Sequence, residues 1–401
     1  MDRRWRSVLL DTLVMTAGFG TLTMMAVAKP DVIAHFGIDD NAYEWQHIAY
    51  VFGLFIAFLL GHTRIYEGSF KRSVAIALSW AAIAQALIPL APNWYVVVFL
   101  RFIQGFVVTL VPLFSTQIAH FFVAERPFAK GIVLSGIFWG GVFGSMSAKY
   151  AVASFGWKGG FWVTVIIMYA VLALWWVLTE DFEIIHRSEG EARINVWKMP
   201  FTWVLGFTFF PALWVIFTII GFSASLGYSM GWTKEHVATL STSLNVSKAL
   251  WSIGMGYVGY MLSRKNPSAK GLFRAIVQVM IFSYAVAFIG LLVYGKAMLA
   301  GNYTLALASV VLIGALQGTG PAFWTSAPAT YPKSIFPKAS FALGLISNSA
   351  NAIAPTVTEI LARQGTGLAL AELALMPILG ILTLLAVSRM RLPVEELGDA
   401  A

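Results

Sequence analysis

The sequence predicts an all-α membrane protein with twelve transmembrane helices in two pseudo-symmetric six-helix bundles. Of its 401 residues, 58% are hydrophobic and only 11% are charged, whereas soluble domains carry roughly 25% charged residues. The apolar residues come in blocks of about twenty, the length at which a helix crosses a bilayer. These blocks lack the two-residue alternation of barrel strands, and in lipid their backbone groups must be satisfied internally, so they are predicted to be helices.

Twelve blocks are long enough to span. The first follows a basic N-terminal segment, Met1 to Ser7, and is too long for the apolar part of a signal peptide, which predicts a retained helix. The predicted spans are 8–28, 43–62, 74–92, 94–117, 130–153, 160–179, 203–227, 237–262, 275–294, 303–330, 340–362 and 368–388.

The longest polar stretch, Glu180–Pro200, separates six spans from six. It predicts an N-terminal bundle over 1–180, a cytoplasmic linker over 181–200 and a C-terminal bundle over 201–401. The halves also share a short repeat. Gln104-Gly105 precedes Phe128-Ala129-Lys130-Gly131, and Gln317-Gly318 precedes Phe341-Ala342-Leu343-Gly344 at the same offset. Parallel repeats of this kind build one large class of transporters.

The distribution of basic residues predicts the orientation. With twelve spans, the side that holds both termini carries nineteen Lys and Arg, and the opposite side carries six: Lys29, Lys149, Lys158, Lys234, Lys296 and Arg363. The positive-inside rule therefore predicts cytoplasmic termini in a multi-pass protein of the cell (inner) membrane.

Charge and composition also exclude several functions. The net charge of +8 could indicate a nucleic-acid partner, but the basic residues lie between apolar blocks and form no continuous basic face. The absence of cysteine excludes disulfides, thiol catalysis and cysteine-based zinc sites. No catalytic constellation, metal site, cofactor site or ATP-binding cassette is evident, so transport would be driven by substrate or ion gradients.

Several segments resemble the major facilitator superfamily. Leu100 to Gly105 is similar to its R-x-x-Q-G motif, and Gly156 to Trp162 resembles its G-W-R-x-x-F-W start of helix six. Pro30 and His35 to Ile38 lie where family members end helix one. The loop Gly61 to Arg72 falls where the family carries G-x-x-x-D-R-x-G-R-R, with Ile65 in the place of the acid and Glu67 as a substitute. The resemblance implies two bundles that rock around a midplane site.

Helix five departs from one family pattern. The segment Gly136 to Gly144 has the glycines of the antiporter motif G-x-x-x-G-P-x-x-G-G but lacks its proline. This departure favours symport or uniport over drug antiport. The alternative is that these glycines only allow close helix packing.

Lys248 is the leading substrate-site candidate. It lies at least roughly 16 Å from either end of its span, counted at 1.5 Å per residue. An ammonium at that depth costs ~3 kcal/mol unless it faces water or a partner. It belongs to a polar stripe at three- and four-residue spacing: Ser241, Asn245, Lys248, Ser252 and Gly256. The alternative is a structural ion pair or a lysine bonded to helix carbonyls.

No Asp or Glu lies near the middle of any span. Asp11, Glu44, Glu359 and Glu372 all lie near span ends. A cavity with a lysine and no central carboxylate attracts anions. A basic residue on helix eight resembles the anion-binding device of the family's carboxylate and nitrate carriers, although their signature motifs are not evident here.

Other polar and aromatic residues are weaker candidates. Asn348, Asn351 and Gln317 lie in apolar helices and would bind substrate or join helices. Aromatic candidates for the cavity wall are Trp139, Trp214, Trp251 and Trp324. The assigned substrate-binding set is Lys248, Asn245, Ser252, Trp251, Asn348, Asn351, Gln317 and Trp324.

Three residues are assigned to proton coupling. His47 lies one turn into the second span, three residues after Glu44, and imidazole titrates near neutral pH. Its alternative is a hydrogen-bonded interfacial histidine. Arg101 opens the fourth span, where the family has an arginine that is structural or coupled to protonation of a helix-one acid. Span one offers only Asp11, at the wrong end, so a structural role or an outer pair with Glu44 is expected for Arg101.

The sequence therefore predicts a secondary carrier of a small organic anion, a carboxylate moved with protons. The expected partners are this anion, protons and the lipid bilayer, and the protein is expected to be a monomer. The alternatives are a carrier of neutral or amphipathic solutes, such as a sugar or drug, and a non-transporting membrane sensor.

Overall fold

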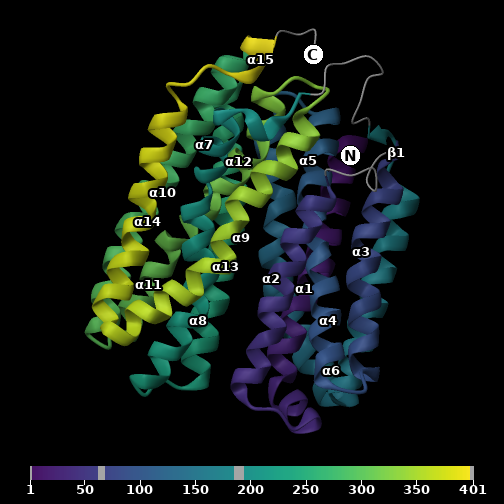
Figure 1. Ribbon diagram of the computed structural model, residues 1–401, viewed down its shortest axis with the longest axis vertical. Coiled ribbons are helices and arrows are strands. Elements are labelled where there is room, and N and C mark those ends of the chain that lie inside the picture. The colour runs from purple at the N-terminus through teal and green to yellow at the C-terminus, as the bar shows by residue number, and fades with distance from the viewer. Residues whose placement is uncertain (1, 62–67, 185–193, 398–401) are drawn as a thin grey trace. The chain divides into compact units, whose positions relative to one another are not determined.

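The computed structural model describes residues 2–61, 68–184 and 194–397, which are almost entirely helical (Figure 1). Their contacts separate two compact units. The N-terminal unit comprises residues 1–117 and 132–185, and the C-terminal unit comprises residues 118–131 and 186–401. The short segment Ile118–Gly131 thus groups with the C-terminal unit, although the sequence places it in the first half.

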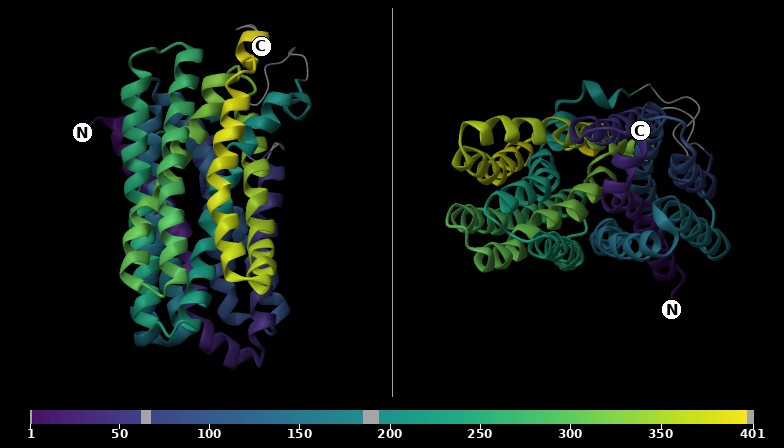
Figure 2. Two further views of the ribbon diagram at one scale, coloured as in Figure 1. Left: turned by 90° about the vertical axis from the view of Figure 1, so that its left-hand side faces the viewer. Right: turned by 90° about the horizontal axis from the view of Figure 1, so that it is seen from below.

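Within each unit the helices run roughly parallel (Figure 2). The helices that lie mainly in the N-terminal unit are α1 (Arg3–Phe36), α2 (Asp40–Leu60), α3 (Phe70–Leu87), α4 (Trp94–Gln104), α5 (Leu110–Phe121) and α6 (Arg126–Leu178). Short 3-10 turns η2 (Ile88–Leu90) and η3 (Gly105–Thr109) follow α3 and α4. Two-residue strands β1 (Gly68–Ser69) and β2 (Glu183–Ile184) pair antiparallel, with Gly68 opposite Ile184.

The C-terminal unit repeats this arrangement. Its helices are α7 (Pro200–Phe207), α8 (Phe210–Ser229), α9 (Lys234–Ser263), α10 (Ala269–Leu299), α11 (Tyr303–Ile313), α12 (Thr319–Thr330), α13 (Phe336–Gln364), α14 (Thr366–Val387) and α15 (Pro393–Leu397). The 3-10 turns are η4 (Val196–Lys198) and η5 (Gly314–Gly318).

Nine helical segments of the described ranges are long and apolar enough to cross a membrane. One of them, α6, contains two predicted spans, which meet at Gly156 where φ is 68°. Helices α9 and α13 are more polar, yet they coincide with the predicted spans 237–262 and 340–362. The arrangement is consistent with twelve spans, and the protein is a multi-pass membrane protein.

The first helix is longer than predicted. It continues through Pro30 to Phe36 and ends where Gly37 adopts a left-handed conformation, with φ 62°. The predicted span 8–28 is therefore the inner part of a longer helix, which ends within the segment His35 to Ile38. A proline inside a helix removes one backbone hydrogen bond, but the remaining bonds continue the helix here.

A 3-10 turn interrupts a helix in each unit, as α4–η3–α5 and α11–η5–α12. The two Gln-Gly pairs of the sequence repeat lie at different ends of these turns: Gln104 ends α4 and Gly105 begins η3, whereas Gln317 and Gly318 are the last residues of η5. A Cβ added to Gly105 would collide with the backbone of α2, and one added to Gly314 would collide with Ser247 of α9. Each bend therefore allows two helices to approach closely.

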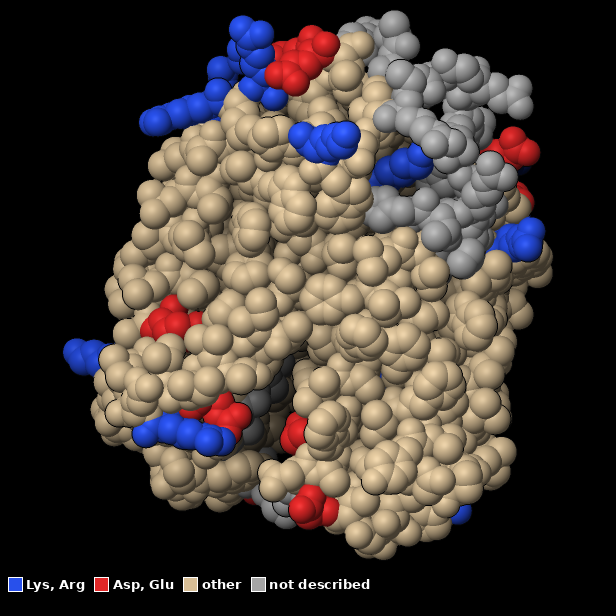
Figure 3. Space-filling model, in the orientation of Figure 1, with Lys and Arg blue, Asp and Glu red and all other residues tan. Residues whose placement is uncertain are grey.

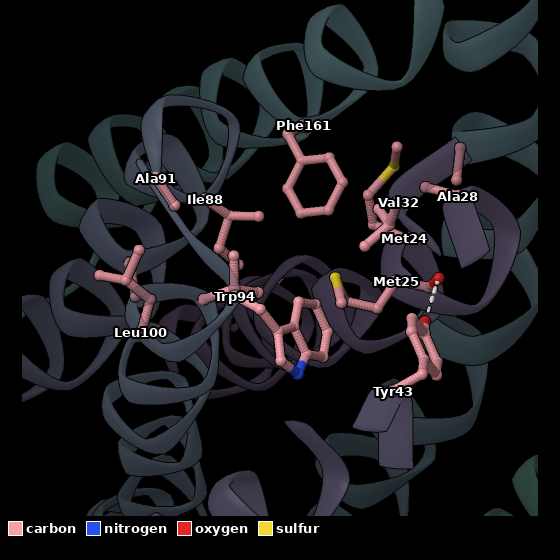
Figure 4. Close-up of a cluster of buried hydrophobic side chains, with 13 residues drawn as sticks. Met24, Met25, Ala28, Val32, Tyr43, Ile88, Ala91, Trp94, Leu100 and Phe161 are labelled. Carbon is pink, nitrogen blue, oxygen red and sulfur yellow. Dashed lines mark hydrogen bonds between the residues drawn. The ribbon is translucent and has the colours of Figure 1, made fainter. Parts of the chain in front are cut away.

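A cluster of buried apolar side chains forms the core of the N-terminal unit (Figure 4). Met24 and Met25 of α1 pack there with Trp94 of α4 and Phe161 of α6. The hydroxyl of Tyr43 donates to the carbonyl oxygen of Met25 at 2.7 Å, which satisfies a polar group inside this core. On the outer surface, charged side chains cover little of the face in Figure 3, as expected of a protein in lipid.

The start of α3 is held by a carboxylate from far along the chain. Asp181 accepts hydrogen bonds from the Ser69 hydroxyl at 2.6 Å and from the N–H of Lys71 at 3.0 Å. Partial burial opposes its charged form, but the donors of Lys71, Ser69 and Phe182 outweigh it and lower the pKa of Asp181. The motif positions Ile65 and Glu67 lie outside the described residues. Asp181 is a carboxylate outside the motif that binds the start of α3.

Candidate functional site

Lys248 lies in the interior of the C-terminal unit. Its side chain is on α9, which begins at the N-cap residue Thr233, and the residue is only 1% exposed. The ammonium Nζ donates to the carbonyl oxygen of Ile216 on α8 at 3.4 Å. A lysine at this depth is a functional candidate by default.

Residues next to Lys248 hold α9 against α11. The Ser247 hydroxyl and the Trp251 indole N–H both donate to the carbonyl oxygen of Val311, at 2.9 and 2.7 Å. Val311 lies just before the change to the 3-10 turn η5, where carbonyls become available to other donors. Trp251, predicted to bind substrate, therefore contributes to helix packing.

Ser252 has a similar packing role. Its hydroxyl donates to the carbonyl oxygen of Gly131 at 2.9 Å, where α6 begins. A Cβ added to Gly256 would lie 2.6 Å from the carbonyl oxygen of Pro127, so the start of α6 and α9 are in close backbone contact. Asn245 is half-buried one turn before Lys248.

The two asparagines of α13 bond to each other. Asn348 donates to the carbonyl oxygen of Gly344 at 2.8 Å, and Asn351 donates to the Asn348 side-chain oxygen at 3.0 Å. Within the described part of the chain, the Asn351 Oδ1 atom is buried without a hydrogen-bond partner. A buried acceptor of this kind is available to a donor that arrives with a ligand.

Two further predicted residues lie around the bend of α11 and α12. Gln317 is buried in η5. Trp324 of α12 is buried, and the Lys130 ammonium lies 5.9 Å from the centre of its ring. The structure thus brings Lys248, Asn245, Trp251 and Ser252 together on α9, and Asn348 with Asn351 on α13. Both helices pack against α8.

Glu372, which the sequence placed only near the end of a span, forms hydrogen bonds that connect three helices. Glu372 of α14 accepts from the indole N–H of Trp214 on α8 and, at 3.0 Å, from the hydroxyl of Thr358 on α13. Trp214 was a candidate for the cavity wall, and here it is a hydrogen-bond donor. The available signal was that Glu372 is the single charged residue in the sequence of α14.

Arg101 is the centre of a polar chain inside the N-terminal unit. It is 3% exposed and donates to the side-chain oxygens of Gln46, at 2.7 Å, and Gln104. Gln104 donates to Gln85, which donates to Thr164 at 2.9 Å. This chain joins α2, α4, α3 and α6, as expected for a structural arginine.

The other proton-coupling candidates lie apart from this chain. The Glu44 carboxylate is 3.9 Å from the Lys29 ammonium, so the outer pair expected between Glu44 and Arg101 is replaced by Glu44 with Lys29. His47 is exposed. The structure does not bring His47, Glu44 and Arg101 into one hydrogen-bonded group within the described residues.

The N-terminal unit contains a cavity of about 390 Å³. It lies between α1 and α6 and is lined mostly by apolar groups, together with Thr16, Thr21, Ser147 and Thr164. The hydroxyls of these residues already donate to carbonyls of their own helices. None of the residues that the sequence singled out as a site lies there.

Comparisons with known proteins agree with this architecture. The sequence model of the Major Facilitator Superfamily matches residues 12–355. The chain is 23% identical over 364 residues to the gallate transporter of Pseudomonas putida. This alignment covers 81% of this chain and 78% of the relative.

Solved structures share the fold. A crystal structure of the human organic anion transporter MFSD10 (TETRAN) superposes with a TM-score of 0.72 at 13% identity, covering 96% of this chain and 100% of the other. The E. coli fucose:proton symporter FucP gives a TM-score of 0.70 at 13% identity, covering 96% and 98%. Because the family match extends over most of the sequence and the fold agrees, this chain is a membrane transporter that belongs to the major facilitator superfamily.

Proposed function

We propose that the protein is a secondary carrier that moves a small organic carboxylate across the cell membrane together with protons. The observation that carries the proposal is Lys248, a lysine enclosed in the C-terminal unit whose described hydrogen bond is to a backbone carbonyl. A carbonyl compensates an ammonium less well than an anion does. A substrate carboxylate would give this ammonium a charge-assisted interaction.

Two similar proteins support the substrate class. One relative is a gallate transporter and one structural neighbour is an organic anion transporter. The buried Asn351 oxygen adds an acceptor in the same unit. A site that uses both this acceptor and the Lys248 ammonium would suit a carboxylate that also carries a hydroxyl group. Because Lys248 is enclosed, the anion would reach it in a conformation that opens this surface, as alternating access requires.

We further propose cytoplasmic termini in the inner membrane, from the excess of basic residues on that side. The proposed domain boundaries remain 1–180 and 201–401 with a linker between them, and the proposed form is a monomer.

The test is uptake by the purified protein in liposomes. Hydroxylated aromatic and aliphatic carboxylates should accumulate under an inward proton gradient, and sugars should not. A protonophore should abolish accumulation and leave exchange of internal for external carboxylate. Accumulation that survives the protonophore would reject proton symport, and an absence of carboxylate flux in every condition would reject the proposed substrate class.

The second candidate function is transport of neutral amphipathic compounds. The observation that favours it is the cavity of about 390 Å³ in the N-terminal unit, whose walls are mostly apolar. Its hydroxyl oxygens can accept hydrogen bonds, so it suits apolar ligands with donors. Uptake of neutral phenols with no response to a proton gradient would favour this function over the first.

A further inference from the structure

Glu372 and Glu359 are the acidic residues of the C-terminal unit that lie inside predicted spans, and Glu359 is exposed and paired with Arg363. Glu372 is six residues after Thr366, the first residue of α14, which is about 9 Å along the helix axis. Its side chain is half-buried. Ionisable groups at such depth are costly to maintain and are functional candidates for that reason.

Both hydrogen-bond partners that the structure gives Glu372 are neutral. Trp214 donates from its indole to one carboxylate oxygen, and Thr358 donates its hydroxyl to the other. Among the residues that the structure describes, no Lys, Arg or His lies within ion-pair distance of Glu372. Neutral donors hold a carboxylate in place without preventing its protonation, whereas an arginine or lysine would keep it charged.

The helices packed against α14 are α7, α8, α10 and α13, and their titratable groups have other partners or positions. Tyr284 and Tyr294 of α10 bond to Thr208 and Ser223. On α13, Glu359 pairs with Arg363 at 2.6 Å. The exposed Tyr228 and Lys296 lie on α8 and α10, and α7 has none. The remaining charged residues lie near the first residues of α10 and α13, at the end of these helices that is far from Glu372: Lys270, Arg274 and Lys338.

The two partners of Glu372 lie on the helices that also hold the proposed anion site. Trp214 is two residues before Ile216, whose carbonyl accepts from Lys248. Thr358 is seven residues after Asn351 on α13, about 10 Å along the axis. A change in the charge of Glu372 therefore acts on both helices, and through them on Lys248 and on Asn351.

We propose that Glu372 is the proton-binding site that couples the proton gradient to substrate movement. This inference rests on the proton symport of the proposed function and assigns to Glu372 the role that the sequence gave to His47, Glu44 and Arg101. Protonation converts a carboxylate that accepts two hydrogen bonds into a neutral acid. It weakens the bonds to α8 and α13 and so changes how these helices are held around the anion.

The decisive variant is Glu372→Gln. The amide keeps an oxygen that accepts from Trp214 and an NH₂ that donates to Thr358, but it cannot bind or release a proton. The matched control is Glu359→Gln, which removes an exposed carboxylate from the neighbouring helix. Both are compared with the parent protein in liposomes for accumulation, for exchange, and for the pH dependence of exchange.

For one proton per substrate, a gradient of about one pH unit supports about tenfold accumulation. We expect Glu372→Gln to lose this accumulation and the pH dependence, while exchange falls much less. Glu359→Gln should behave as the parent. A purely structural role for Glu372 predicts a Glu372→Gln protein that still accumulates substrate about tenfold with the parent pH dependence, and this result would overturn the proposal.

A second measurement does not require any substrate. Infrared difference spectra between neutral and mildly acidic pH should show a protonated carboxyl band in the parent and in Glu359→Gln but not in Glu372→Gln. An unchanged band in Glu372→Gln would reject Glu372 as the proton site, even if no carboxylate flux were found. If the band is lost but no carboxylate is transported, Glu372 remains the proton site and the proposed substrate class is rejected.

A third variant addresses loss of folding. Trp214→Phe removes one donor to the carboxylate and leaves Glu372 in place. The carboxyl band should then appear at higher pH than in the parent, because the charged form loses a hydrogen bond. A band at the parent pH would contradict the proposal.

Discussion

The ammonium of Lys248 and the carbonyl oxygen of Ile216 lie 3.4 Å apart and join α9 to α8 in the interior of the C-terminal unit. A structural lysine and a substrate-binding lysine both make such a contact in one conformation. The two kinds of lysine differ in the effect of removing the ammonium. Loss of a structural lysine destabilises the fold, whereas loss of a substrate-binding lysine destabilises the complex with the anion.

Replacement of Lys248 should distinguish a structural role from a substrate-binding role. We expect Lys248→Ala to weaken binding of the carboxylate by about 30- to 4000-fold, because loss of one desolvated charge pair costs roughly 2–5 kcal/mol. Lys248→Arg should keep binding but change selectivity, since a planar fork holds anions differently from a point charge. Binding and melting temperature are measured on the same samples, with the exposed Lys296→Ala as control. A strongly destabilised Lys248→Ala protein with near-normal affinity would reject the anion site.

Gly53 of α2 should not tolerate a methyl group. A Cβ there would collide with the carbonyl oxygen of Phe102 on α4, so Gly53→Ala should destabilise the protein by about 1–3 kcal/mol or more. Gly254→Ala is the matched control, because its Cβ would meet no atom within 4 Å and alanine favours a helix by about 0.5–1 kcal/mol. Thermal unfolding in detergent measures both. Equal melting temperatures for the two variants would contradict the close contact of α2 and α4.

Arg101 should act mainly through the fold. Its guanidinium bonds Gln46 and Gln104 simultaneously, and a lysine ammonium does not reproduce this planar geometry. Arg101→Lys should therefore lower stability by about 2–4 kcal/mol, as expected when a buried charge loses partners. The control is Arg274→Lys at an exposed position. If Arg101→Lys melts like the parent but loses proton-driven accumulation, Arg101 has the coupling role instead.

The bonds around Asp181 should weaken in acid. Because the folded pKa of Asp181 lies below its ordinary value of 3.8, its contribution is complete above the unfolded pKa. It is lost as the pH falls through the lowered folded pKa. Asp181 is exposed, so the contribution is less than about 1 kcal/mol. Protection of the N–H groups of Lys71 and Phe182 against hydrogen exchange, measured relative to the intrinsic rate at each pH, should fall in this acidic range, and in Asp181→Asn at all pH values. Glu183→Gln is the control, and exchange in Asp181→Asn as slow as in the parent would exclude the carboxylate as the group that holds the start of α3.

The sequence by itself determined the membrane-helix architecture, the place of most helices and the family. These follow from hydropathy and block length, because an isolated helix must satisfy its own backbone in lipid whatever its neighbours are. It also identified Lys248 as a buried cation.

Only the tertiary structure decided the partners of these residues. Trp251 and Ser252 bind backbone carbonyls of other segments, and Glu44 lies beside Lys29 while Arg101 bonds glutamines. The Trp214–Glu372–Thr358 group joins three helices separated by up to 158 residues. Helical periodicity fixes which face of its own helix a side chain occupies, but hydrogen bonds between helices depend on their rotation and depth, which packing decides.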